Sequence, residues 1–495
     1  MEHMAGTARS AATASPGVDP TTLPLCVDLD GTLLATDSLQ EAAIAAGLAD
    51  PRILAALPRW LLEGKARLKE ALAQRWDFEP AQLPYNLELL AYLQEQKARG
   101  RMLVLATAAD RRIAQKIAAH LGLFDEVIAS DGAVNRGGSA KAAALAERFG
   151  AKGFVYAGNA LADLAVWRDA AAAIVVGAPE RIRAAAAVAA PVERAFARQG
   201  SVARGLVRAL RPHQWVKNLL VFVPLLCAVA YGNSAGWEAA LACFAGFCAI
   251  ASAIYILNDI GDLASDRAHP RKSRRPFASG AVPVGLGLAL APLLLAIGFA
   301  LGWESDAARD LAIYALLSLA YNLKLKEMPL VDVFVLAALY SVRLFAGGEA
   351  SGNEVSLWLL GFSSFMFLSL ALIKRVSELQ QILKQQRRVN ERRGYMIEDL
   401  NMLAMMGCAA CFTSALVLTL YVQSDTASHY YPHPKMLWGI VPLMLFWQCR
   451  LWLSTARGYM HDDPIVYAAR DWVSWLVLGA LGALVAGASF FPVLV

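Results

Sequence analysis

The sequence predicts an α/β domain followed by an all-helical membrane domain. Hydrophobic residues make up 57% of the 495 positions and charged residues only 18%, and the mean hydropathy of +0.43 is too high for an average soluble protein. The apolar excess begins after about residue 211, where runs of roughly 17–25 apolar residues, long enough to span a bilayer, follow one another. Before about residue 200, short apolar stretches alternate with ordinary turn signals.

Four segments are expected along the chain. Residues 1–21 are small and polar and lack the apolar core of a signal peptide, so we interpret them as a disordered tail. The α/β domain covers residues 22–195, a basic linker covers 196–215, and the membrane domain covers 216–495. The linker mixes basic and apolar residues in the manner of an amphipathic helix that lies on the inner leaflet.

About nine membrane spans satisfy the length criterion. They are placed near residues 218–235, 238–259, 282–302, 308–323, 330–347, 356–373, 402–421, 436–453 and 473–494. Loops rich in Lys and Arg alternate with loops that are poor in them, and the longest basic loop runs from Lys374 to Arg393. The positive-inside rule therefore predicts a multi-pass protein of the cell inner (plasma) membrane, with the N-terminal domain cytoplasmic and the C-terminus outside.

The charge and cysteine content indicate which partners and cofactors the sequence favours. The formal net charge of +5 is modest, and the basic residues cluster beside apolar runs, which favours membrane lipid over nucleic acid. The pair "CAAC" at 408–411 lies in an apolar run and is interpreted as two small apolar residues rather than a redox pair. No zinc-ligand spacing appears in the sequence. A homo-oligomer is compatible with this pattern.

A polar stretch, "NDIGDLASDR", follows the second apolar run. Asn258, Asp262 and Asp266 are spaced by four residues, so they share one face if the helix continues. Carboxylates aligned at a membrane surface repel each other and lose hydration, and a divalent cation relieves both costs. Mg²⁺ prefers one or two carboxylates together with substrate phosphates. The following basic run, "RAHPRKSRRP", supplies donors to those phosphates, although an acidic cap followed by a lipid-binding basic loop is the alternative.

The N-terminal domain opens with a second reactive pattern, "LPLCVDLDGTLLATDSL". An apolar strand ends at Asp28, Asp30, Gly31 and Thr32. Two aspartates two residues apart at a strand end can divide a reaction, because the first attacks phosphorus and the second handles the proton. The pattern predicts a phosphate-transferring site.

This DxDGT pattern resembles the haloacid dehalogenase (HAD) phosphatase superfamily, over about residues 22–195. Later pieces follow in the family's order: Thr107 ends a second strand, Lys141 would neutralise a phosphorylated aspartate, and Asn159 and Asp163 lie beside a third strand. The resemblance implies a doubly wound α/β fold with a helical cap near 37–97 and the site at the carboxyl ends of the strands.

The HAD resemblance also implies a Mg²⁺ site formed by Asp28, Asp30, Asn159 and Asp163. The last motif of the family usually reads GDxxxD, whereas this chain has "GNALAD". Asn159 therefore removes one negative charge and weakens the expected metal site. A degenerate domain kept for folding or regulation is the alternative to an active phosphatase.

The stretch "NDIGDLASDR" resembles the NDxxDxxxDR motif of UbiA-type intramembrane prenyltransferases, and the resemblance covers roughly residues 205–495. It implies nine helices and a Mg²⁺–diphosphate site with Asn258, Asp262 and Asp266 as ligands. The stretches "RPHQWVKNLLVFVPL", "HPRKSRRPFASG", "YNLKLKEMPLVDVFVLA" and "GYMHDDPIVYAARD" look most like the decaprenyl-phosphate phosphoribosyltransferase type. That type transfers 5-phosphoribose from phosphoribosyl diphosphate to polyprenyl phosphate and releases diphosphate.

Candidate substrate-binding residues come from these stretches. They are Lys217, Asn218, Asp259, Arg267, Arg271, Lys272, Arg275, Tyr321, Lys324, Lys326, Asp332, Lys374 and Arg375. An aromatic-prenylating member usually carries a second Asp-rich motif where this chain has the cationic loop 321–332, and cations suit additional phosphates. Anchoring at helix ends is the alternative for the four cations from Lys324 to Arg375, as is snorkelling to the interface for Arg343.

The sequence thus predicts a Mg²⁺-dependent polyprenyl-phosphate phosphoribosyltransferase whose HAD domain removes the 5-phosphate of the product. One alternative is a UbiA-type prenyltransferase that acts on an aromatic or other ring acceptor, with an unrelated phosphatase attached. Another is a lipid-binding scaffold with inactive sites.

Overall fold

The computed structural model describes residues 19–198, 200–384, 394–460 and 463–490. The chain divides into two compact units: unit 1, residues 1–206 with 259–287, and unit 2, residues 207–258 with 288–495. The stretch "NDIGDLASDR" at 258–267 is called the aspartate-rich stretch below. All of it except Asn258 lies in segment 259–287, which groups with the N-terminal residues. Most of the predicted tail, and Arg387, Arg388, Arg392 and Arg393 of the long basic loop, lie outside the described residues.

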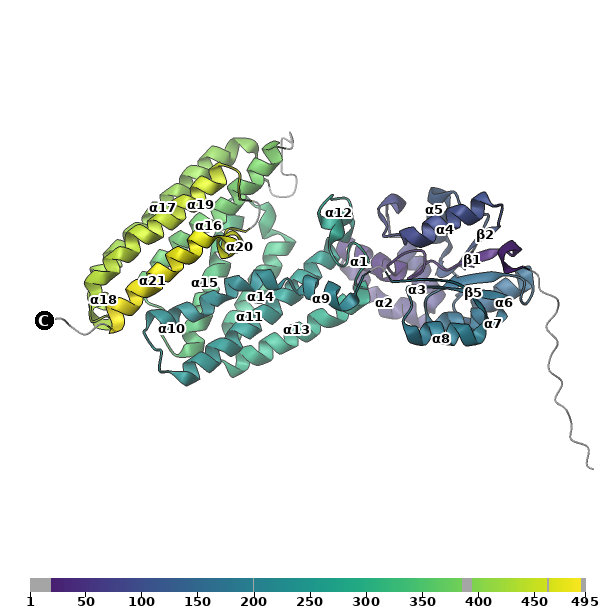
Figure 1. The fold of residues 1–495 in the computed structure, drawn as a ribbon, viewed down its shortest axis with the longest axis horizontal. Helices are drawn as coiled ribbons and strands as arrows, with labels where there is room; N and C mark the ends of the chain where they lie inside the picture. The colour runs from purple at the N-terminus through teal and green to yellow at the C-terminus, as the bar shows by residue number, and fades with distance from the viewer. Residues whose placement is uncertain (1–18, 199, 385–393, 461–462, 491–495) are drawn as a thin grey trace, which may run out of the picture. The chain divides into compact units, whose positions relative to one another are not determined.

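A six-stranded parallel sheet forms the centre of unit 1 (Figure 1). Its strands are β1 (Leu25–Val27), β2 (Leu103–Asp110), β3 (Glu126–Ser130), β4 (Val155–Gly158), β5 (Ala172–Val176) and β6 (Val192–Phe196). The spatial order is β3-β2-β1-β4-β5-β6, with Leu25 of β1 paired to Leu103 on one side and to Val155 on the other. This doubly wound order has its switch point at β1, where ligands bind in such sheets. It confirms the predicted fold class.

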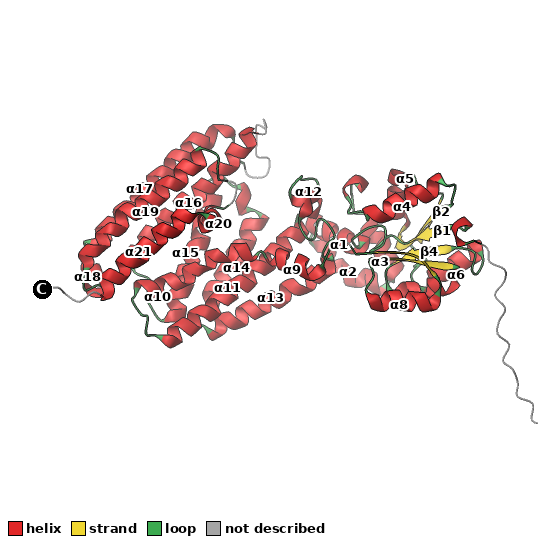
Figure 2. Ribbon diagram, viewed as in Figure 1, coloured by secondary structure: helices red, strands yellow, loops and turns green. Residues whose placement is uncertain are grey.

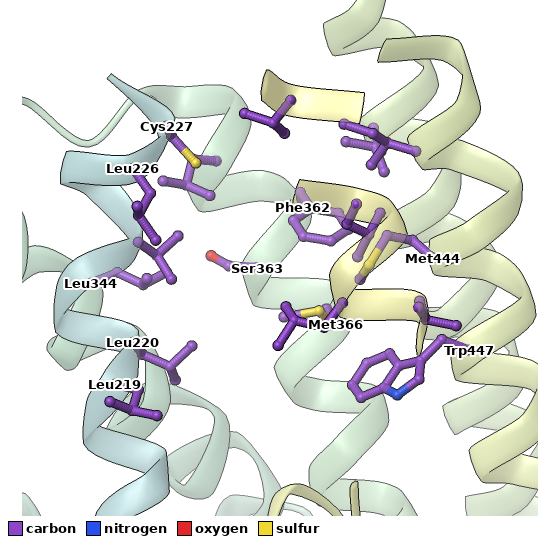
Figure 3. Close-up of a pocket in the computed structure, with 18 of the residues that line it drawn as sticks. Leu219, Leu220, Leu226, Cys227, Leu344, Phe362, Ser363, Met366, Met444 and Trp447 are labelled. Carbon is purple, nitrogen blue, oxygen red and sulfur yellow. The ribbon is translucent and has the colours of Figure 1, made fainter. Parts of the chain in front are cut away.

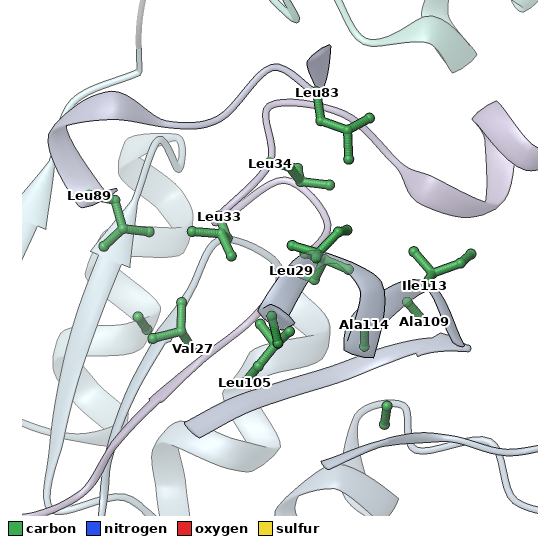
Figure 4. Packing of buried hydrophobic residues seen from close by; sticks show 14 of the residues in the cluster. Val27, Leu29, Leu33, Leu34, Leu83, Leu89, Leu105, Ala109, Ile113 and Ala114 are labelled. Carbon is green, nitrogen blue, oxygen red and sulfur yellow. The ribbon is translucent and has the colours of Figure 1, made fainter. Parts of the chain in front are cut away.

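Alternate residues of the strands enter two different cores, as the two-residue period of a strand requires. Val27 and Leu105 belong to one buried cluster, which also contains Leu89 and Ile113 (Figure 4). Cys26, the residue before Val27 in β1, belongs to a second cluster, on the other face. Both faces of the sheet are therefore covered, which explains why its strands are continuous apolar runs.

Unit 1 also contains helices, several of which flank the sheet (Figure 2). They are α1 (Ser38–Ala49), α2 (Arg52–Leu62), α3 (Lys65–Ala73), α4 (Leu87–Ala98), α5 (Arg111–Leu121), α6 (Ser139–Phe149), α7 (Leu164–Asp169), α8 (Glu180–Ala189) and, in the second segment, α12 (Leu263–Arg267). Helices α1 to α4 lie between β1 and β2 in sequence, where the helical cap was predicted. Asp37 caps α1 by accepting the N–H of Gln40, which fixes the chain just beyond β1.

Unit 2 is built from helices. They are α10 (Val223–Cys227), α11 (Ser234–Gly261), α13 (Val284–Glu304), α14 (Ala308–Leu323), α15 (Val331–Ser351), α16 (Leu357–Lys384), α17 (Leu400–Val422), α18 (Asp425–Tyr430), α19 (Ile440–Ala456), α20 (Pro464–Arg470) and α21 (Trp472–Phe490). The C-terminal end of α11 and the start of α13 fall in unit 1, and α9 (Val202–Leu210) crosses the same division within the predicted linker.

Seven helical segments in the described ranges are long and apolar enough to cross a membrane. They confirm a membrane-integral protein, but the predicted number of about nine spans is not confirmed. The first predicted span, 218–235, contains the end of a 3-10 helix, Pro212–Phe222, and the short helix α10. The fourth, 308–323, forms α14, which has 16 residues and falls short of the usual spanning length.

A close crossing fixes α16, which carries Lys374 and Arg375, against α17 and α19. A Cβ at Gly407 would lie 2.1 Å from the ring of Trp452, so only glycine fits there. Trp452 Nε1 donates to Ser369 Oγ at 2.9 Å, and Ser369 Oγ donates to the Gly407 carbonyl at 2.9 Å. Three helices are thus joined by packing and by a satisfied buried polar chain.

Candidate active sites

The first candidate site lies where β1 ends in unit 1. Asp28 follows β1, and its backbone N–H donates to the Ala157 carbonyl at 3.0 Å. The chain then turns sharply at Gly31, whose φ is +74° and whose N–H donates to the Thr36 carbonyl at 3.1 Å. A Cβ at Gly31 would lie 2.1 Å from the amide nitrogen of Asn159. Glycine therefore provides both the backbone conformation and the room for Asn159 beside the turn.

A buried chain of hydrogen bonds joins Asp28 to Asp163. Lys141 Nζ donates to Asp28 Oδ1 and to the Tyr156 hydroxyl, each at 2.6 Å. Tyr156 donates in turn to Asp163 Oδ1 at 2.9 Å. Asp163 Oδ2 accepts the backbone N–H groups of Asn159 and residue 160, each at 3.0 Å. Both oxygens of Asp163 are thus engaged, Oδ1 by Tyr156 of β4 and Oδ2 by the loop that follows β4.

The two aspartates of the DxDGT pattern have raised pKa values. Burial raises the pKa of Asp28 to about 6; the Lys141 ammonium opposes this rise, while the Asp163 carboxylate adds to it. Burial, followed by the charge of Asp37, raises the pKa of Asp30 to about 7. Burial alone would lower the pKa of Lys141, but the carboxylates of Asp28 and Asp163 outweigh it and the pKa is raised. Near neutral pH, Asp28 is ionised while Asp30 still holds a share of its proton, which suits a nucleophile beside an acid.

The other predicted residues of this site have local roles in the fold. Asp30 Oδ1 accepts the N–H of Ser38 at 2.8 Å, which ties the turn to the first turn of α1. Thr107 is fully buried in β2, and its Oγ1 accepts the N–H of Ala109 at 3.0 Å. Sequence reasoning missed Tyr156, although its place in "VYAG", at the end of a strand, was a usable signal.

The aspartate-rich stretch forms a second polar cluster in unit 1. Helix α11 ends at Gly261, and Asp262 precedes α12 with φ of −94° and ψ of 9°. A continuous helix, which would align Asn258, Asp262 and Asp266 on one face, is therefore interrupted here. Instead, Arg275 Nη1 lies 3.0 Å from Asp259 Oδ1 and 2.6 Å from Asp266 Oδ2.

Asp266 is the most deeply placed carboxylate of this cluster. Its Oδ1 is buried and has no hydrogen-bond partner among the described residues. Burial raises the pKa of Asp266 even though Arg275 lowers it. Among the cations, Arg271 is exposed and Lys272 half-buried on the following loop, and Arg267 forms an ion pair with Glu41 of α1. Sequence reasoning missed Glu41, because a lone glutamate near the start of a helix is usually solvated.

Unit 2 contains a polar cluster in which cations outnumber carboxylates, since two lysines share one aspartate. Lys217 Nζ donates to Asp463 Oδ2 at 2.7 Å, and Lys374 Nζ lies 3.5 Å from the same oxygen. The Tyr340 hydroxyl donates to Asp463 Oδ1 at 3.2 Å. Burial alone would raise the pKa of Asp463, but the two lysines outweigh it and lower the pKa to about 2. Asp463 lies in the quoted stretch "GYMHDDPIVYAARD", yet it was not singled out from the sequence.

Arg343 does not reach an interface by snorkelling in unit 2. Its side chain is buried, Nε donates to Asn218 Oδ1 at 2.8 Å, and Nη2 donates to the Tyr314 hydroxyl at 3.2 Å. Arg343 thereby holds Asn218, the neighbour of Lys217, and places a further cation inside the bundle.

The cationic loop 321–332 contains one buried pair and an exposed part. Arg375 Nη2 lies 2.6 Å from Asp332 Oδ2 with both side chains fully buried, and the Tyr395 hydroxyl donates to Asp332 Oδ1. The Tyr321 hydroxyl accepts a long hydrogen bond of 3.4 Å from Arg375. In the exposed part, Lys324 forms an ion pair with Glu327 at 2.7 Å. Lys326 is half-buried on the same turn.

An apolar cavity of about 540 Å³ opens within unit 2 (Figure 3). Leu219, Leu344, Phe362, Met366 and Trp447 are among the residues that face it. Its lining also includes Val216 and Ile465, which lie next to the cationic cluster. Val216 precedes Lys217, and the N–H of Ile465 donates to Asp463 Oδ1 at 3.2 Å. The cavity thus has the apolar walls of a lipid site with charged groups at one margin.

Two groups of side chains offer the oxygen donors that Mg²⁺ requires. In the described ranges, no three His, Cys, Asp or Glu side chains converge on a ready metal centre. Mg²⁺ commonly takes only one or two carboxylates and completes its shell with water and substrate phosphates. Asp28 with the Asn159 amide, and separately the unpaired Asp266 Oδ1, offer hard oxygen donors whose raised carboxyl pKa values a cation would reverse. Both donor sets fit such an ion.

Two family profiles match the chain in separate regions. That of the UbiA prenyltransferase family matches residues 219–458, and that of the haloacid dehalogenase-like hydrolases matches residues 25–173. The chain is 37% identical to the uncharacterized protein y4nM of Sinorhizobium fredii over 94% of its own length and 90% of that protein. The chain belongs to the UbiA prenyltransferase family and carries an N-terminal HAD-like hydrolase domain.

Two further relatives match a smaller share of the chain. The nodulation protein NoeC of Azorhizobium caulinodans is 36% identical over 55% of this chain and 90% of that protein. Decaprenyl-phosphate phosphoribosyltransferase of Mycolicibacterium smegmatis is 38% identical over 36% of this chain and 57% of that enzyme. Among solved structures, a UbiA homolog from Archaeoglobus fulgidus bound to DMAPP and Mg²⁺ aligns with 57% of this chain and 99% of its own, at 15% identity and a TM-score of 0.45.

Proposed function

We propose that this protein transfers 5-phosphoribose from phosphoribosyl diphosphate to a polyprenyl phosphate. The bond that forms joins the phosphate oxygen of the lipid to the anomeric carbon of ribose, and the bond that breaks releases diphosphate. The proposal places this reaction at the cytoplasmic face of the plasma membrane. The relatives named as decaprenyl-phosphate phosphoribosyltransferases support it.

The observation that carries the proposal is the apolar cavity with cations at its margin. A polyprenyl chain fits apolar walls, and its phosphate needs positive charge close by. Lys217 and Lys374 share the single carboxylate of Asp463, so this group of three keeps a formal charge of +1. The fixed charge of Asp463 holds both ammonium groups in place before the lipid phosphate arrives, which lowers the cost of ordering them.

The loop 321–332, whose only aspartate is paired with Arg375, favours phosphoribosyl transfer over prenylation of a ring acceptor. A second Asp-rich motif would hold a further metal ion with exposed carboxylates. Here, Asp332 is fully buried and already paired with Arg375 and Tyr395, so it offers no such ligand. The cavity alone does not separate the two reactions, since both use a polyprenyl substrate.

We further propose that the HAD domain hydrolyses the 5-phosphate of the transferase product. Asp28 attacks the phosphorus atom and forms a phosphorylated carboxylate, while Asp30 gives its proton to the departing ribose oxygen. Asp30 then takes a proton from the water that releases phosphate, and Lys141 offsets the negative charge throughout. When bound, Mg²⁺ would neutralise phosphate charge at both sites, held by Asp28 and Asn159 in one and by Asp266 in the other.

A labelled-substrate assay tests both steps. Purified protein is incubated with Mg²⁺, phosphoribosyl diphosphate carrying label in its ribose, and polyprenyl phosphate, and the lipid phase is counted. We expect label in the lipid phase and release of inorganic phosphate from the labelled lipid. Absence of lipid-linked label together with prenylation of an aromatic acid would favour the ring-acceptor reaction. Hydrolysis of other phosphates but not of the lipid product would refute the second step.

A further inference from the structure

A buried ion pair links the HAD-like domain to the aspartate-rich segment within unit 1. Arg267 Nη1 donates to Glu41 Oε2 at 2.7 Å, and Nη2 donates to Glu41 Oε1 at 2.6 Å. The two side chains are only 6% and 5% exposed. A two-pronged pair of this kind fixes direction as well as distance, because the planar guanidinium matches the carboxylate.

Each partner of the pair is tied to its own surroundings. Arg267 Nε donates to the carbonyl of Ala278 at 3.0 Å, which closes the loop that follows α12. Glu41 also accepts a hydrogen bond from the hydroxyl of Thr36. The Thr36 carbonyl in turn accepts the N–H of Gly31, in the turn that follows Asp28. The pair therefore lies between the turn that holds Asp28 and the loop that holds Arg275.

Backbone packing accompanies the ion pair. Gly280 has φ of +73°, and a Cβ there would lie 2.5 Å from the Cβ of Ala35 and 2.7 Å from its carbonyl oxygen. A Cβ at Gly285 would lie 2.9 Å from the side-chain nitrogen of Gln40. Residues 280–285 thus lie directly against residues 35–41, and the close approach depends on glycine.

We propose that Glu41 is a positioning residue for the transferase, holding Arg267 so that Arg275 bridges Asp259 and Asp266. This inference rests on the proposed function for its kinetic readout. Without Glu41, the buried Arg267 cation has no carboxylate partner in this place, and an unpaired buried charge is strongly unfavourable. The loop would open to hydrate Arg267, or Arg267 would turn to the carboxylates of its own segment and compete with substrate phosphate and Mg²⁺.

The test compares three variants of the full-length protein. Glu41→Gln removes the charge with nearly unchanged shape, and Glu41→Asp keeps the charge on a shorter side chain. Glu63→Gln is the matched control, because Glu63 belongs to the same helical region but pairs with exposed Arg59. Each protein is assayed for phosphoribosyl transfer, for hydrolysis of a small phosphate ester, and for trypsin cleavage after the exposed Arg271 and Arg274.

We expect Glu41→Gln to lower kcat/KM for phosphoribosyl diphosphate and to speed cleavage after Arg271 and Arg274, each by about tenfold or more. The KM for polyprenyl phosphate should stay within about twofold, because its proposed ligands Lys217 and Lys374 belong to unit 2. Glu41→Asp should fall between Glu41→Gln and wild type. Ester hydrolysis should persist in all variants, and Glu63→Gln should match wild type throughout.

Wild-type cleavage and transfer rates in Glu41→Gln would overturn the inference. So would equal losses of transfer and ester hydrolysis with cleavage throughout unit 1, provided that Glu41→Asp behaves the same way, since this indicates general unfolding. If wild type itself transfers no ribose to lipid, the proposed function fails, and the cleavage rates alone decide whether Glu41 positions the segment.

Discussion

Two buried lysine–aspartate pairs, one in each unit, have almost the same length, but the pKa values of their carboxyl groups shift in opposite directions. Lys141 lies 2.6 Å from Asp28, and Lys217 lies 2.7 Å from Asp463. The pKa of Asp28 is nevertheless raised to about 6, whereas that of Asp463 is lowered to about 2. Burial acts in the same direction on both carboxyl groups, so the other neighbours decide the outcome.

The number of carboxylates and cations in each cluster explains the contrast. Asp28 shares one ammonium with the nearby Asp163, while Asp463 alone faces the ammonium groups of Lys217 and Lys374. The unit 1 cluster has surplus negative charge and a carboxyl group poised to react or to meet a cation. The unit 2 cluster has surplus positive charge and a carboxylate that stays ionised. Contact distance alone therefore does not separate a reactive carboxylate from one that holds its neighbours.

Removing the reactive carboxylate of Asp28 should have the largest effect on the contrast between the two lysine–aspartate pairs. Asp28→Asn should lower phosphatase activity by about 10³-fold or more, because the amide is no nucleophile. Transfer of ribose to lipid should persist, because that reaction uses other residues. Parallel assays of phosphate release and of lipid-linked label check this. A well-folded Asp28→Asn protein that also loses transfer would mean that the two reactions are coupled.

The aspartate-rich segment gives the next largest expected effect. Asp266→Ala or Asp262→Ala should lower transfer by about 100-fold or more, since each removes negative charge from the place where diphosphate and its cation are expected to bind. Hydrolysis of a small phosphate ester serves as the internal control for folding. Near-normal transfer in both variants would refute this assignment of the diphosphate site.

Loss of the ionised carboxylate in unit 2 should have a moderate effect. Asp463→Asn leaves Lys217 and Lys374 without their shared partner, so they repel each other and lose their fixed positions. We expect kcat/KM for polyprenyl phosphate to fall by about tenfold. Steady-state kinetics with varied lipid substrate measure this effect. An unchanged value would show that Asp463 does not organise the lipid-phosphate site.

The pH dependence of the two activities sharpens the same contrast. Phosphatase activity should fall as pH drops through about 6, because Asp28 becomes protonated and stops acting as a nucleophile. It should also fall as pH rises through about 7, because Asp30 then lacks the proton that it gives to the leaving group. Asp463, with a pKa of about 2, should add no acid limb to transfer. pH–rate profiles between 5 and 8.5 test both expectations.

The smallest effect concerns stability. Burial, with Asp37 next in importance, raises the pKa of Asp30 from 3.8 to about 7 in the folded protein. The neutral form is therefore favoured by folding, and this stabilisation is fully present below pH 3.8 and lost as pH rises through 7. Asp30→Asn should raise the Tm of unit 1 at pH 8 by about 3 °C or more and leave it unchanged near pH 4. An equal Tm at pH 8 would show that the site is better solvated than its burial implies.

Local patterns predicted the fold of unit 1 and the type of unit 2. The apolar strands and the Asp28–Gly31 turn predict a parallel sheet with its site at β1, and the length of the apolar runs predicts the membrane spans. The predicted number of about nine spans is not confirmed, because hydropathy does not reveal that residues 218–235 contain the end of a 3-10 helix and the short α10. The four-residue spacing from Asn258 to Asp266 likewise does not reveal the break at Asp262.

Long-range partners explain most of what sequence reasoning missed. Glu41 and Arg267 are 226 positions apart, and Lys217 and Asp463 are 246 apart. Neither glutamate nor aspartate stands out in its own stretch, since charged residues at helix ends are ordinarily solvated. Their partners become visible only when the chain is folded. Burial then distinguishes them, because a fully enclosed charge requires a counter-charge.

The discontinuity of unit 1 affects how this protein can be taken apart. A gene fragment that stops in the linker, near residue 200, encodes the complete sheet but omits residues 259–287, which group with it. Such a fragment would expose Ala35 and leave Glu41 facing water instead of Arg267. The complementary fragment would carry the aspartate-rich stretch without the surface against which it folds. Separately expressed halves are therefore poor substitutes for the intact chain, and point substitutions are the sounder route to its two reactions.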